Sequence, residues 1–309
     1  MESTALKIAA CVCTYRRNEP LARLLERLAE IADRSADRFQ LGVVVVDDNP
    51  GGDAEPVVES FVDRFPLGVH YRRCGHQNIS LARNAALQGG AELAEVVVMT
   101  DDDCVPDVEW IDALLDTREA TGADSVSGPL LVMLPPGAPA WLQKQRVFDF
   151  DHEVIPDGAP LDTGQTNNCL IDTAWLAAHP EHRFDPEYGR IGGEDMVFFR
   201  GAIALGMRSF HSERARVHQY EPMDEVTLWA LMKSRFWWGN SEAVINLETS
   251  AASRPRLVVR GARRCARALA MPLRRSLRRD SPHGRVALIG VARGAGLVVG
   301  ALGVRMNHH

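Results

Sequence analysis

Short apolar runs and stretches of helical periodicity alternate over the first 127 residues. Apolar runs at residues 7–14, 41–46 and 96–99, with a shorter one at 69–71, have the length and composition of buried strands. Helical periodicity lies between them, over residues 55–65 and 80–87 and in an earlier set of five residues, Leu21, Leu24, Leu25, Leu28 and Ile31. This alternation predicts an α/β fold with a doubly wound, mostly parallel sheet flanked by helices, and ligands at the strand ends.

The pattern changes after residue 128. Residues 128–160 are rich in proline and polar side chains, so we expect long connections there. A further helix is predicted over residues 196–205, and a strand is predicted to end at residues 217–220. We therefore expect one domain over residues 1–250, with halves at 1–127 and 128–250, and an Arg-rich helical extension over residues 251–309.

Charge is distributed unevenly along the chain. The 309 residues have an ordinary globular composition, 46% hydrophobic and 25% charged, with a formal net charge of −6. Residues 254–309 carry thirteen arginines and one acid, Asp280, which leaves +12 there and −18 in the preceding residues. This tail is either an amphipathic helix on an anionic membrane surface or an extension packed on the acidic body. Residues 286–304 are nearly all apolar but contain Arg293, which favours interfacial contact or docking over spanning a bilayer.

Several classes of protein are not supported by the sequence. The six cysteines form neither a CxxC pair nor a cluster with zinc spacing, which predicts a reducing cytosol. The first residues lack the basic and apolar segments of a signal peptide, so we expect a cytoplasmic protein. The dinucleotide GxGxxG motif and the P-loop motif are both absent, and the arginines of the tail lack interleaved aromatic residues. We therefore do not expect nucleic-acid binding.

Acidic side chains gather where two predicted strands end. Asp101, Asp102 and Asp103 follow the strand at residues 96–99, and Asp47 and Asp48 follow the strand at residues 41–46. Neighbouring carboxylates repel one another, and hard oxygen ligands suit Mg²⁺ or Mn²⁺, so the triplet predicts a metal site. The alternative is that one of these aspartates caps a helix that opens at residues 106–111. The earlier pair predicts hydrogen bonds to a nucleobase or ribose, with simple turn chemistry as the alternative.

Other candidates are less specific on their own. Arg83 suits a phosphate, but a surface helix arginine is the alternative. Glu194 and Asp195 follow two glycines that permit close backbone approach to a ligand, and the helix that they begin should keep Asp195 ionised. Stabilisation of that helix alone is the alternative reading of the pair. A lone histidine such as His218 is more often a core or surface residue than a ligand, and Trp141 is either an acceptor platform or a loop anchor.

In their order along the chain, these residues resemble the motifs of family 2 glycosyltransferases of the GT-A fold, over residues 5–245. The matching motifs are Thr14-Tyr15-Arg16, Asp47-Asp48-Asn49, Ala82-Arg83-Asn84, Thr100-Asp101-Asp102-Asp103, Gly193-Glu194-Asp195 and His218. Processive members carry Gln-x-x-Arg-Trp, whereas the nearest stretch here is Met232-Lys233-Ser234-Arg235-Phe236. The resemblance is therefore to non-processive, bacterial-type members, without the membrane helices of a polysaccharide synthase.

The resemblance implies a nucleotide-sugar donor in the first half of the domain. Residues at the ends of the first two strands would lie around the nucleoside: Thr14, Tyr15, Arg16, Asp47 and Asp48. Arg83 would approach the diphosphate, and Asp101 or Asp102 would lie near the ribose.

The resemblance also implies a metal, a base and an acceptor side. Asp103 would be the chief ligand of Mn²⁺ or Mg²⁺, with Asp101 and His218 as further ligands. Asp195 would be the general base, with Glu194 beside it. The acceptor half would present three residues: Asn167, Asn168 and Trp141.

The activity implied is that of an inverting, metal-dependent hexosyltransferase. It would move one sugar from a nucleotide-diphosphate sugar, with UDP the expected nucleotide, to a hydroxyl of a glycan, lipid-linked or natural-product acceptor. Direct displacement needs a base and charge neutralisation on the leaving diphosphate, and no covalent nucleophile. Two alternatives are a non-catalytic sugar-nucleotide-binding protein of the same fold and a phospho-acceptor module in which Asp101 is phosphorylated. We expect a cytoplasmic enzyme, peripheral on the inner face of the membrane if the tail binds lipid.

Overall fold

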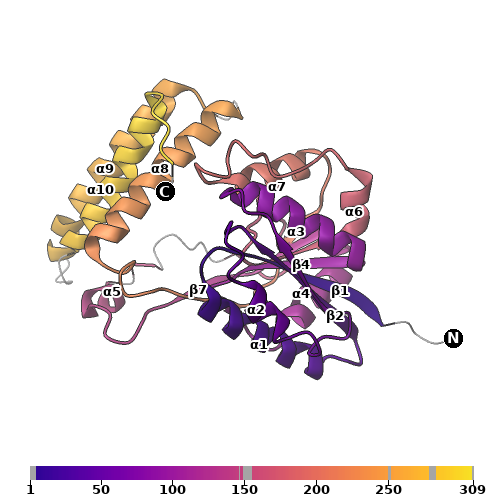
Figure 1. Ribbon diagram of the computed structural model, residues 1–309. Coiled ribbons are helices and arrows are strands. Elements are labelled where there is room, and N and C mark those ends of the chain that lie inside the picture. The colour runs from indigo at the N-terminus through magenta and orange to yellow at the C-terminus, as the bar shows by residue number, and fades with distance from the viewer. Residues whose placement is uncertain (1–4, 146, 149–154, 250–251, 278–282, 308–309) are drawn as a thin grey trace. The chain divides into compact units, whose positions relative to one another are not determined.

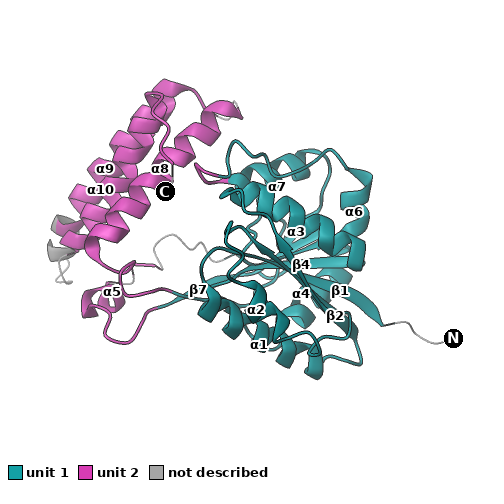
Figure 2. Ribbon diagram, viewed as in Figure 1, with its two compact units in different colours: residues 1–133, 154–189, 194–220 teal, residues 134–153, 190–193, 221–309 magenta. Residues whose placement is uncertain are grey.

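The computed structural model describes residues 5–145, 147–148, 155–249, 252–277 and 283–307, with the backbone alone for residues 273–277. The chain forms two compact units (Figure 2). The first comprises residues 1–133, 154–189 and 194–220, and the second comprises residues 134–153, 190–193 and 221–309. The predicted donor and acceptor halves, residues 1–127 and 128–250, do not coincide with these two units. They were defined by function, and that division stays a prediction.

A seven-stranded sheet forms the centre of the first unit (Figure 1). Its strands, in spatial order, are β3 (Val69–Arg73), β2 (Phe39–Asp47), β1 (Leu6–Thr14), β4 (Val96–Asp101), β8 (Cys169–Asp172), β6 (Ser125–Ser127) and β9 (Ser209–His211). The first four run parallel, and only β8 is antiparallel to its neighbours. The doubly wound, mostly parallel sheet is therefore confirmed. A small second sheet has the order β5 (Cys104–Pro106), β10 (Val217–Tyr220), β7 (Leu130–Met133).

Helices cover both faces of the large sheet, because alternate residues of its central strands point to opposite sides. Val43 and Val45 pack in a core with α1 (Asn18–Arg34), the α2 region (Glu55–Glu59) and α4 (Trp110–Thr121). Val44 and Val46 pack in a second core with α3 (Ile79–Leu93), α6 (Thr173–Ala178) and α7 (Glu194–Ala204). All five apolar positions predicted for the first helix are buried in α1.

Two predicted helix boundaries are wrong. The helix expected to open at residue 106 begins at Trp110, because residues 104–106 form β5 and pair with β10. The helix expected over residues 55–65 ends at Glu59. Phe61 and Phe65 beyond it are still buried in the core. The apolar pattern therefore predicted the burial of these residues correctly but their helical backbone incorrectly.

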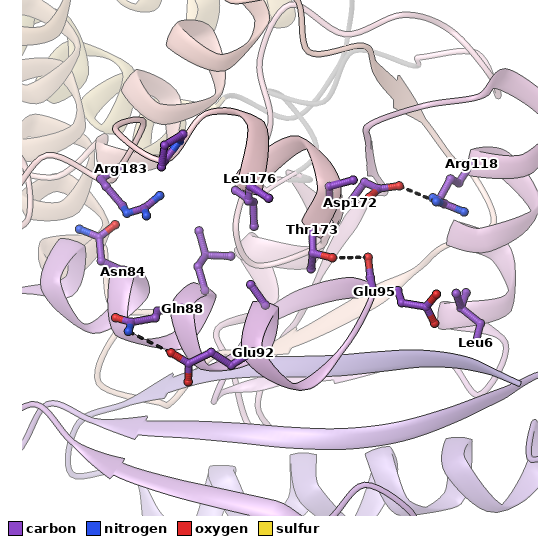
Figure 3. A pocket seen from close by; sticks show the side chains of 15 residues that line it. Leu6, Asn84, Gln88, Glu92, Glu95, Arg118, Asp172, Thr173, Leu176 and Arg183 are labelled. Carbon is purple, nitrogen blue, oxygen red and sulfur yellow. Dashed lines mark hydrogen bonds and ion pairs between the residues drawn. The ribbon is translucent and has the colours of Figure 1, made fainter. Parts of the chain in front are cut away.

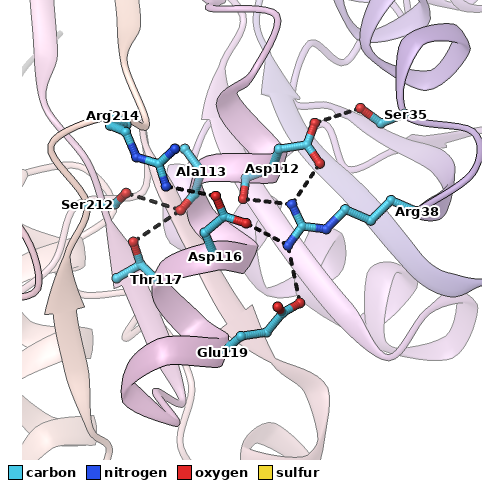
Figure 4. A network of polar contacts seen from close by, with 9 residues as sticks. All are labelled: Ser35, Arg38, Asp112, Ala113, Asp116, Thr117, Glu119, Ser212 and Arg214. Atoms are coloured by element: carbon cyan, nitrogen blue, oxygen red, sulfur yellow. Dashed lines mark hydrogen bonds and ion pairs between the residues drawn. The ribbon is translucent and has the colours of Figure 1, made fainter.

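A polar network on the α4 side braces the first unit (Figure 4). The Arg38 guanidinium contacts Asp112 at 2.9 Å, Asp116 at 2.8 Å and Glu119 at 3.2 Å, all on α4. Arg214 contacts Asp116 at 2.7 Å from the segment that leads to β10. The network joins three parts of the chain that are distant in sequence.

The second unit contains α5 (Ala140–Lys144) and three long helices, α8 (Leu228–Glu248), α9 (Arg254–Leu277) and α10 (Gly284–Ala301). The long helices lie side by side because glycines let their backbones approach (Figure 1). A Cβ atom on Gly296 would lie 1.9 Å from the Phe236 carbonyl oxygen, and one on Gly261 would lie 2.7 Å from that of Gly294. The predicted helical basic extension is therefore α9 with α10.

Helix α10 is long and apolar enough to cross a membrane by length and composition, but 44% of it is buried within the protein. Burial of this extent is also a property of the central helix of a bundle. Arg278 and Arg279 of the basic tail lie outside the described residues.

Candidate active site

Strands β1, β2 and β4 end at the same edge of the large sheet. Backbone pairing aligns Thr14 with Asp47 on one side of β1 and Cys13 with Asp101 on the other. The strand order also changes direction between β1 and β4, and α/β folds bind ligands at the carboxyl edge of such a switch point. The sheet therefore brings the predicted strand-end residues to one place.

Asp47 and Asp48 are buried and hold the loops around this edge. Asp47 accepts hydrogen bonds from the N–H groups of Asn49 (2.8 Å) and Ala54 (3.1 Å) and from the Tyr71 hydroxyl (3.1 Å). Asp48 accepts hydrogen bonds from three successive N–H groups, those of residues 76–78, at 2.6–3.0 Å. Both carboxylates thus position backbone, and their contact with a nucleoside stays a prediction.

Asp102 and Asp103 face Thr14 and Arg17 at the end of β4. The Thr14 hydroxyl donates to Asp102 at 2.7 Å, and the Arg17 guanidinium reaches Asp102 at 3.3 Å and Asp103 at 2.7 Å. Burial raises the pKa of Asp102 to about 6 against the opposing charge of Arg17. Burial and the neighbouring Asp101 charge also raise the pKa of Asp103. Among the described residues, Arg17 alone forms ion pairs with these two carboxylates and it is half-exposed, so a further cation is favoured here.

Arg17 was missed as a site residue by the sequence reasoning, which selected its neighbours. Tyr15 and Arg16 are exposed at the end of β1, and the Arg16 guanidinium lies 5.2 Å from the Tyr15 ring centroid. Arg16 has a φ of 56°, and this left-handed conformation belongs to the turn that follows β1. Because Arg16 and Arg17 are adjacent in one turn, the sequence could not show which of them faces Asp102 and Asp103.

Arg83 is a buried cation that connects two acidic motifs. From α3 its guanidinium donates to Glu194 at the start of α7 and, at 3.4 Å, to Asp101 at the end of β4. Burial lowers the pKa of Arg83, but the Glu194 and Asp101 charges outweigh burial and leave that pKa raised. Arg83 is therefore not the surface arginine of the alternative hypothesis, and its ion pair with Glu194 had no signal in the sequence.

Asp195 follows Glu194 in the first turn of α7. One of its oxygens accepts a hydrogen bond from the Met196 N–H at 2.7 Å. Burial and the Glu194 charge raise the pKa of Asp195 to about 6, against the lowering effect of Arg83. The sequence led us to expect a carboxylate stabilised in its ionised form by the helix N-terminus. Burial outweighs the effects of Arg83 and the Met196 N–H, so this carboxylate is more basic than an exposed aspartate, but a pKa of about 6 still leaves it ionised at neutral pH.

The two glycines before Glu194 adopt left-handed conformations, with φ of 81° at Gly192 and 86° at Gly193. A Cβ atom on Gly192 would lie 2.3 Å from the Trp237 ring, and one on Gly193 would lie 2.1 Å from Ile245. Both neighbours belong to α8. The close backbone approach that the glycines predicted is thus an approach to α8, and it needs no ligand.

Asn168, predicted on the acceptor side, is fully buried inside the first unit. Its side-chain oxygen accepts a hydrogen bond from the Trp110 indole at 2.8 Å. Its NH₂ group donates to the carbonyl oxygens of Pro129 and Ala215 at 3.0 and 2.7 Å. The structure therefore gives Asn168 a role in supporting the fold in place of the acceptor contact that we expected.

The other two acceptor candidates lie in different units. Asn167 is half-buried in the first unit, and its side-chain oxygen has no hydrogen-bond partner within the described residues. Trp141 lies on α5 in the second unit, where the Arg285 guanidinium is 5.4 Å from its ring centroid. Its neighbours are the apolar residues of that unit, which matches the loop-anchor alternative.

His218 lies on β10 and contacts Asp107, with 2.9 Å between Nε2 and Oδ1. Within the ranges that the structure describes, no group of three or more His, Cys, Asp or Glu side chains is arranged to hold a metal ion. A divalent ion still fits the acidic strand end, because Mg²⁺ sites commonly use one or two carboxylates and complete their shell with substrate phosphates. The charge deficit at Asp102 and Asp103 favours a cation beside Asp103, whereas Asp101 is already paired with Arg83. Asp101 and His218 stay predictions as further ligands.

A pocket of about 650 Å³ lies elsewhere in the first unit, between α3 and α6 (Figure 3). Leu6 at the start of β1 and Glu95 just before β4 line it, so it lies toward the amino ends of these parallel strands. Its polar side chains are paired, Arg118 with Asp172 and Thr173 with the Glu95 carbonyl oxygen. None of the candidate catalytic or donor residues lines it, and we do not assign it to the site.

Comparison with known proteins decides the family. The sequence profile described as Glycosyl transferase family 2 matches residues 9–213, two thirds of the chain, including every candidate donor residue and both Glu194 and Asp195. The chain belongs to this family. It is therefore a glycosyltransferase, and the phospho-acceptor alternative is wrong.

Two curated relatives extend the similarity to most of this glycosyltransferase. It is 34% identical over 313 residues to the succinoglycan biosynthesis protein ExoM of Rhizobium meliloti, with 99% of this chain and 96% of the relative covered. It is 30% identical over 272 residues to the glucosyl-dolichyl phosphate glucuronosyltransferase of Haloferax volcanii, with 80% of each chain covered.

Solved structures support the GT-A fold. S. aureus TarS in complex with UDP aligns with a TM-score of 0.53 at 15% identity, over 96% of this chain and 89% of that one. GalNAc-T7 with UDP, GalNAc and Mn²⁺ aligns with a TM-score of 0.54 at 16% identity, over 80% of this chain and 50% of that one. At these identities the likeness concerns the fold alone.

Proposed function

We propose that this glycosyltransferase moves one sugar from a UDP-sugar to an acceptor hydroxyl with inversion, and that a divalent cation assists. The observation that carries the proposal is the meeting of the three strand ends, with Arg83 joining Asp101 to the Glu194–Asp195 motif. Asp103 and Asp101 would hold Mn²⁺ or Mg²⁺, which when bound neutralises negative charge on the donor diphosphate. The UDP and Mn²⁺ of the structurally similar enzymes support the choice of nucleotide and ion.

Asp195 acts as the general base. The acceptor hydroxyl oxygen forms a bond to the anomeric carbon as the bond from that carbon to the diphosphate oxygen breaks. The hydroxyl proton passes to Asp195, and UDP leaves with the electron pair of the broken bond. A carboxylate with a pKa near 6 is ionised at neutral pH and is still basic enough to accept that proton.

Arg83 and Glu194 are positioning residues for this base. The Arg83–Glu194 ion pair is buried, so it fixes the first turn of α7 against α3. The positive charge of Arg83 also opposes protonation of Asp195. Thr14 and Arg17 hold Asp102 in the same way at the strand end, while Tyr15, Arg16, Asp47 and Asp48 border the nucleoside position.

We further propose that the acceptor is a lipid-linked glycan and that the enzyme works at the inner face of the cell membrane. The names of the two relatives, one in succinoglycan biosynthesis and one acting on a glucosyl-dolichyl phosphate, support this acceptor class. Asn167 is the acceptor candidate that the structure supports best, because its buried oxygen lacks a partner among the described residues.

The decisive test compares Asp195→Asn with Glu194→Gln. We expect Asp195→Asn to lower kcat by about 10²–10⁴-fold, because it keeps the shape and removes the base. UDP affinity, measured by calorimetry with Mn²⁺, should change little. The wild-type rate should rise with pH until about 6 and then level, since the base must be ionised. UDP release from a panel of UDP-sugars, with a lipid-linked glycan present, gives the rates.

Glu194→Gln is the matched control, since it removes the neighbouring charge. We expect a smaller loss of rate, because the amide oxygen of the new side chain can still accept a hydrogen bond from Arg83. Normal turnover by Asp195→Asn together with an inactive Glu194→Gln would transfer the base to Glu194. Normal turnover by both variants would remove the pair from the mechanism.

A further inference from the structure

Helix α9 has an exposed face that carries none of the candidate donor, metal or base residues. Four arginines at spacings of four, three and four residues lie along one stripe of the helix: Arg256, Arg260, Arg263 and Arg267. All four are exposed, and together with Pro255, Val259 and Arg264 they line a shallow groove on the helix surface. We name these four residues the arginine stripe.

The arginine stripe is poorly neutralised by the protein itself. Glu242 of α8 pairs with Arg264 at 2.9 Å, and the guanidinium of Arg260 is 4.0 Å away from the same carboxylate. Within the described residues, Arg256, Arg263 and Arg267 have no ion pair. Like charges three or four residues apart on a helix repel one another, so an external anion would stabilise this face.

An apolar strip lies beside the arginine stripe. Val259 and Leu269 are 48% and 64% exposed, and Ala262 and Ala266 between them are also exposed. The opposite side of α9 is already occupied, because Leu257 is fully buried and Gly261 packs on α10. Among the described residues of the second unit, the exposed apolar strip therefore has no partner, and its residues do not serve to bury α9.

We propose that this face of α9 lies on an anionic lipid bilayer, with the arginine stripe at the headgroups and the Val259–Leu269 strip inserted between them. Helices that combine basic and apolar exposed faces bind in the plane of a membrane surface, and anionic lipid strengthens that binding. A nucleic acid would use the charge but not the apolar strip, and the described residues of α9 include no aromatic side chain to stack on a base. The proposal rests on the membrane location given under Proposed function and assigns the surface that meets the lipid.

The test is co-sedimentation of the full chain with vesicles of phosphatidylcholine alone or with 30 mol% phosphatidylglycerol. We expect binding to the anionic vesicles only, and weaker binding in 0.5 M than in 0.1 M NaCl, because salt screens the charges. Arg256→Gln/Arg263→Gln/Arg267→Gln removes three arginines that make no ion pair in the described structure. The partition coefficient should fall by about 10²-fold, since each arginine near an anionic surface contributes about fivefold.

Two further variants make the result specific. The control Arg23→Gln/Arg183→Gln/Arg216→Gln removes three exposed arginines of the first unit that make no ion pair in the described structure, and should bind anionic vesicles like the wild type. Val259→Ser/Leu269→Ser keeps all charges and should lose the binding that persists in 0.5 M NaCl. Equal binding to both vesicle types, undiminished binding by the triple variant, or an equal loss in the control would overturn the proposal.

The same proteins separate this inference from the proposed activity. Calorimetric UDP affinity of the triple variant should equal that of the wild type, because α9 carries none of the candidate donor residues. Loss of vesicle binding with UDP affinity retained supports the surface assignment. Binding to a 30-base-pair DNA duplex with no binding to anionic vesicles would contradict the proposal and indicate that the partner is a nucleic acid.

Discussion

At the scale of single residues, aspartates in similar sequence contexts serve different purposes because their surroundings differ. Asp48 accepts hydrogen bonds from three backbone N–H groups, which fixes a loop. Asp102 and Asp195 are short of such donors, and burial raises the pKa of each to about 6. The sequence located all three carboxylates, because each stands at a strand end or a helix start. It could not tell the acid that binds backbone N–H groups from the two acids with a raised pKa, because that difference depends on neighbours remote in sequence.

The raised pKa of Asp102 predicts a cost in stability. The folded state binds more protons than the unfolded state between pH 3.8 and about 6, so the free energy of unfolding falls as pH rises through this range. Asp102→Asn should therefore stabilise the metal-free protein by about 1–3 kcal/mol at pH 8, since one pKa unit is 1.36 kcal/mol. The Thr14 hydroxyl can still donate to the amide oxygen.

Urea unfolding in EDTA at pH 8 and at pH 3.5 checks this. The gain should be nearly absent at pH 3.5, where Asp102 is mostly protonated in both states. Asp63→Asn, an exposed acid of the same unit, is the control and should change stability little at either pH. Equal stability of Asp102→Asn and wild type at pH 8 would contradict the assignment of a costly buried charge.

At the scale of secondary structure, local pattern predicted the elements whose burial is local. The spacing of the leucines in α1 was enough to predict a helix, and the valine runs of β2 and β4 were enough to predict strands. Strand β5 was missed because its partner, β10, lies more than a hundred residues away, and its pairing turned a predicted helix start into a strand. The same reason hides the ion pair between Arg83 on α3 and Glu194 on α7.

The packing of α8 against α10 was also invisible in the sequence, and it predicts the effect of a single methyl group. Gly296→Ala would place a Cβ atom 1.9 Å from the Phe236 carbonyl oxygen, so the helices must separate. We expect a loss of about 1–3 kcal/mol in the free energy of unfolding, as for other overpacked sites. Gly284→Ala is the matched control in the same helix, because its Cβ atom would meet open space.

Urea unfolding followed by circular dichroism measures both glycine variants. Gly284→Ala should be neutral or slightly stabilising, because alanine favours a helix over glycine by about 1 kcal/mol. If Gly296→Ala were as stable as Gly284→Ala, α8 and α10 would not pack as closely as the structure indicates.

At the scale of the whole molecule, the chain separates donor chemistry from basic charge. The candidate donor, metal and base residues all belong to the first unit, whereas the arginine stripe and Trp141 belong to the second. Composition alone indicated this separation, since the tail carries +12 and the rest −18. It could not indicate that residues 134–153 and 190–193 group with the tail, because that grouping follows from contacts of α5, Gly192 and Gly193 within the second unit.

This separation predicts which part of the molecule a donor nucleotide stabilises. UDP with Mn²⁺ at 100 times its Kd should stabilise the first unit by about 2.7 kcal/mol, because the ligand binds only the folded state. The melting temperature should rise by several degrees for a unit of this size, at about 2–4 °C per kcal/mol. EDTA should remove most of the shift, and so should Asp103→Asn, because the cation then no longer joins the diphosphate to the strand end. The arginine-stripe triple variant should show the full shift. A shift of the same size in EDTA would make nucleotide binding independent of the metal, and a full shift in Asp103→Asn with Mn²⁺ would remove Asp103 as its ligand.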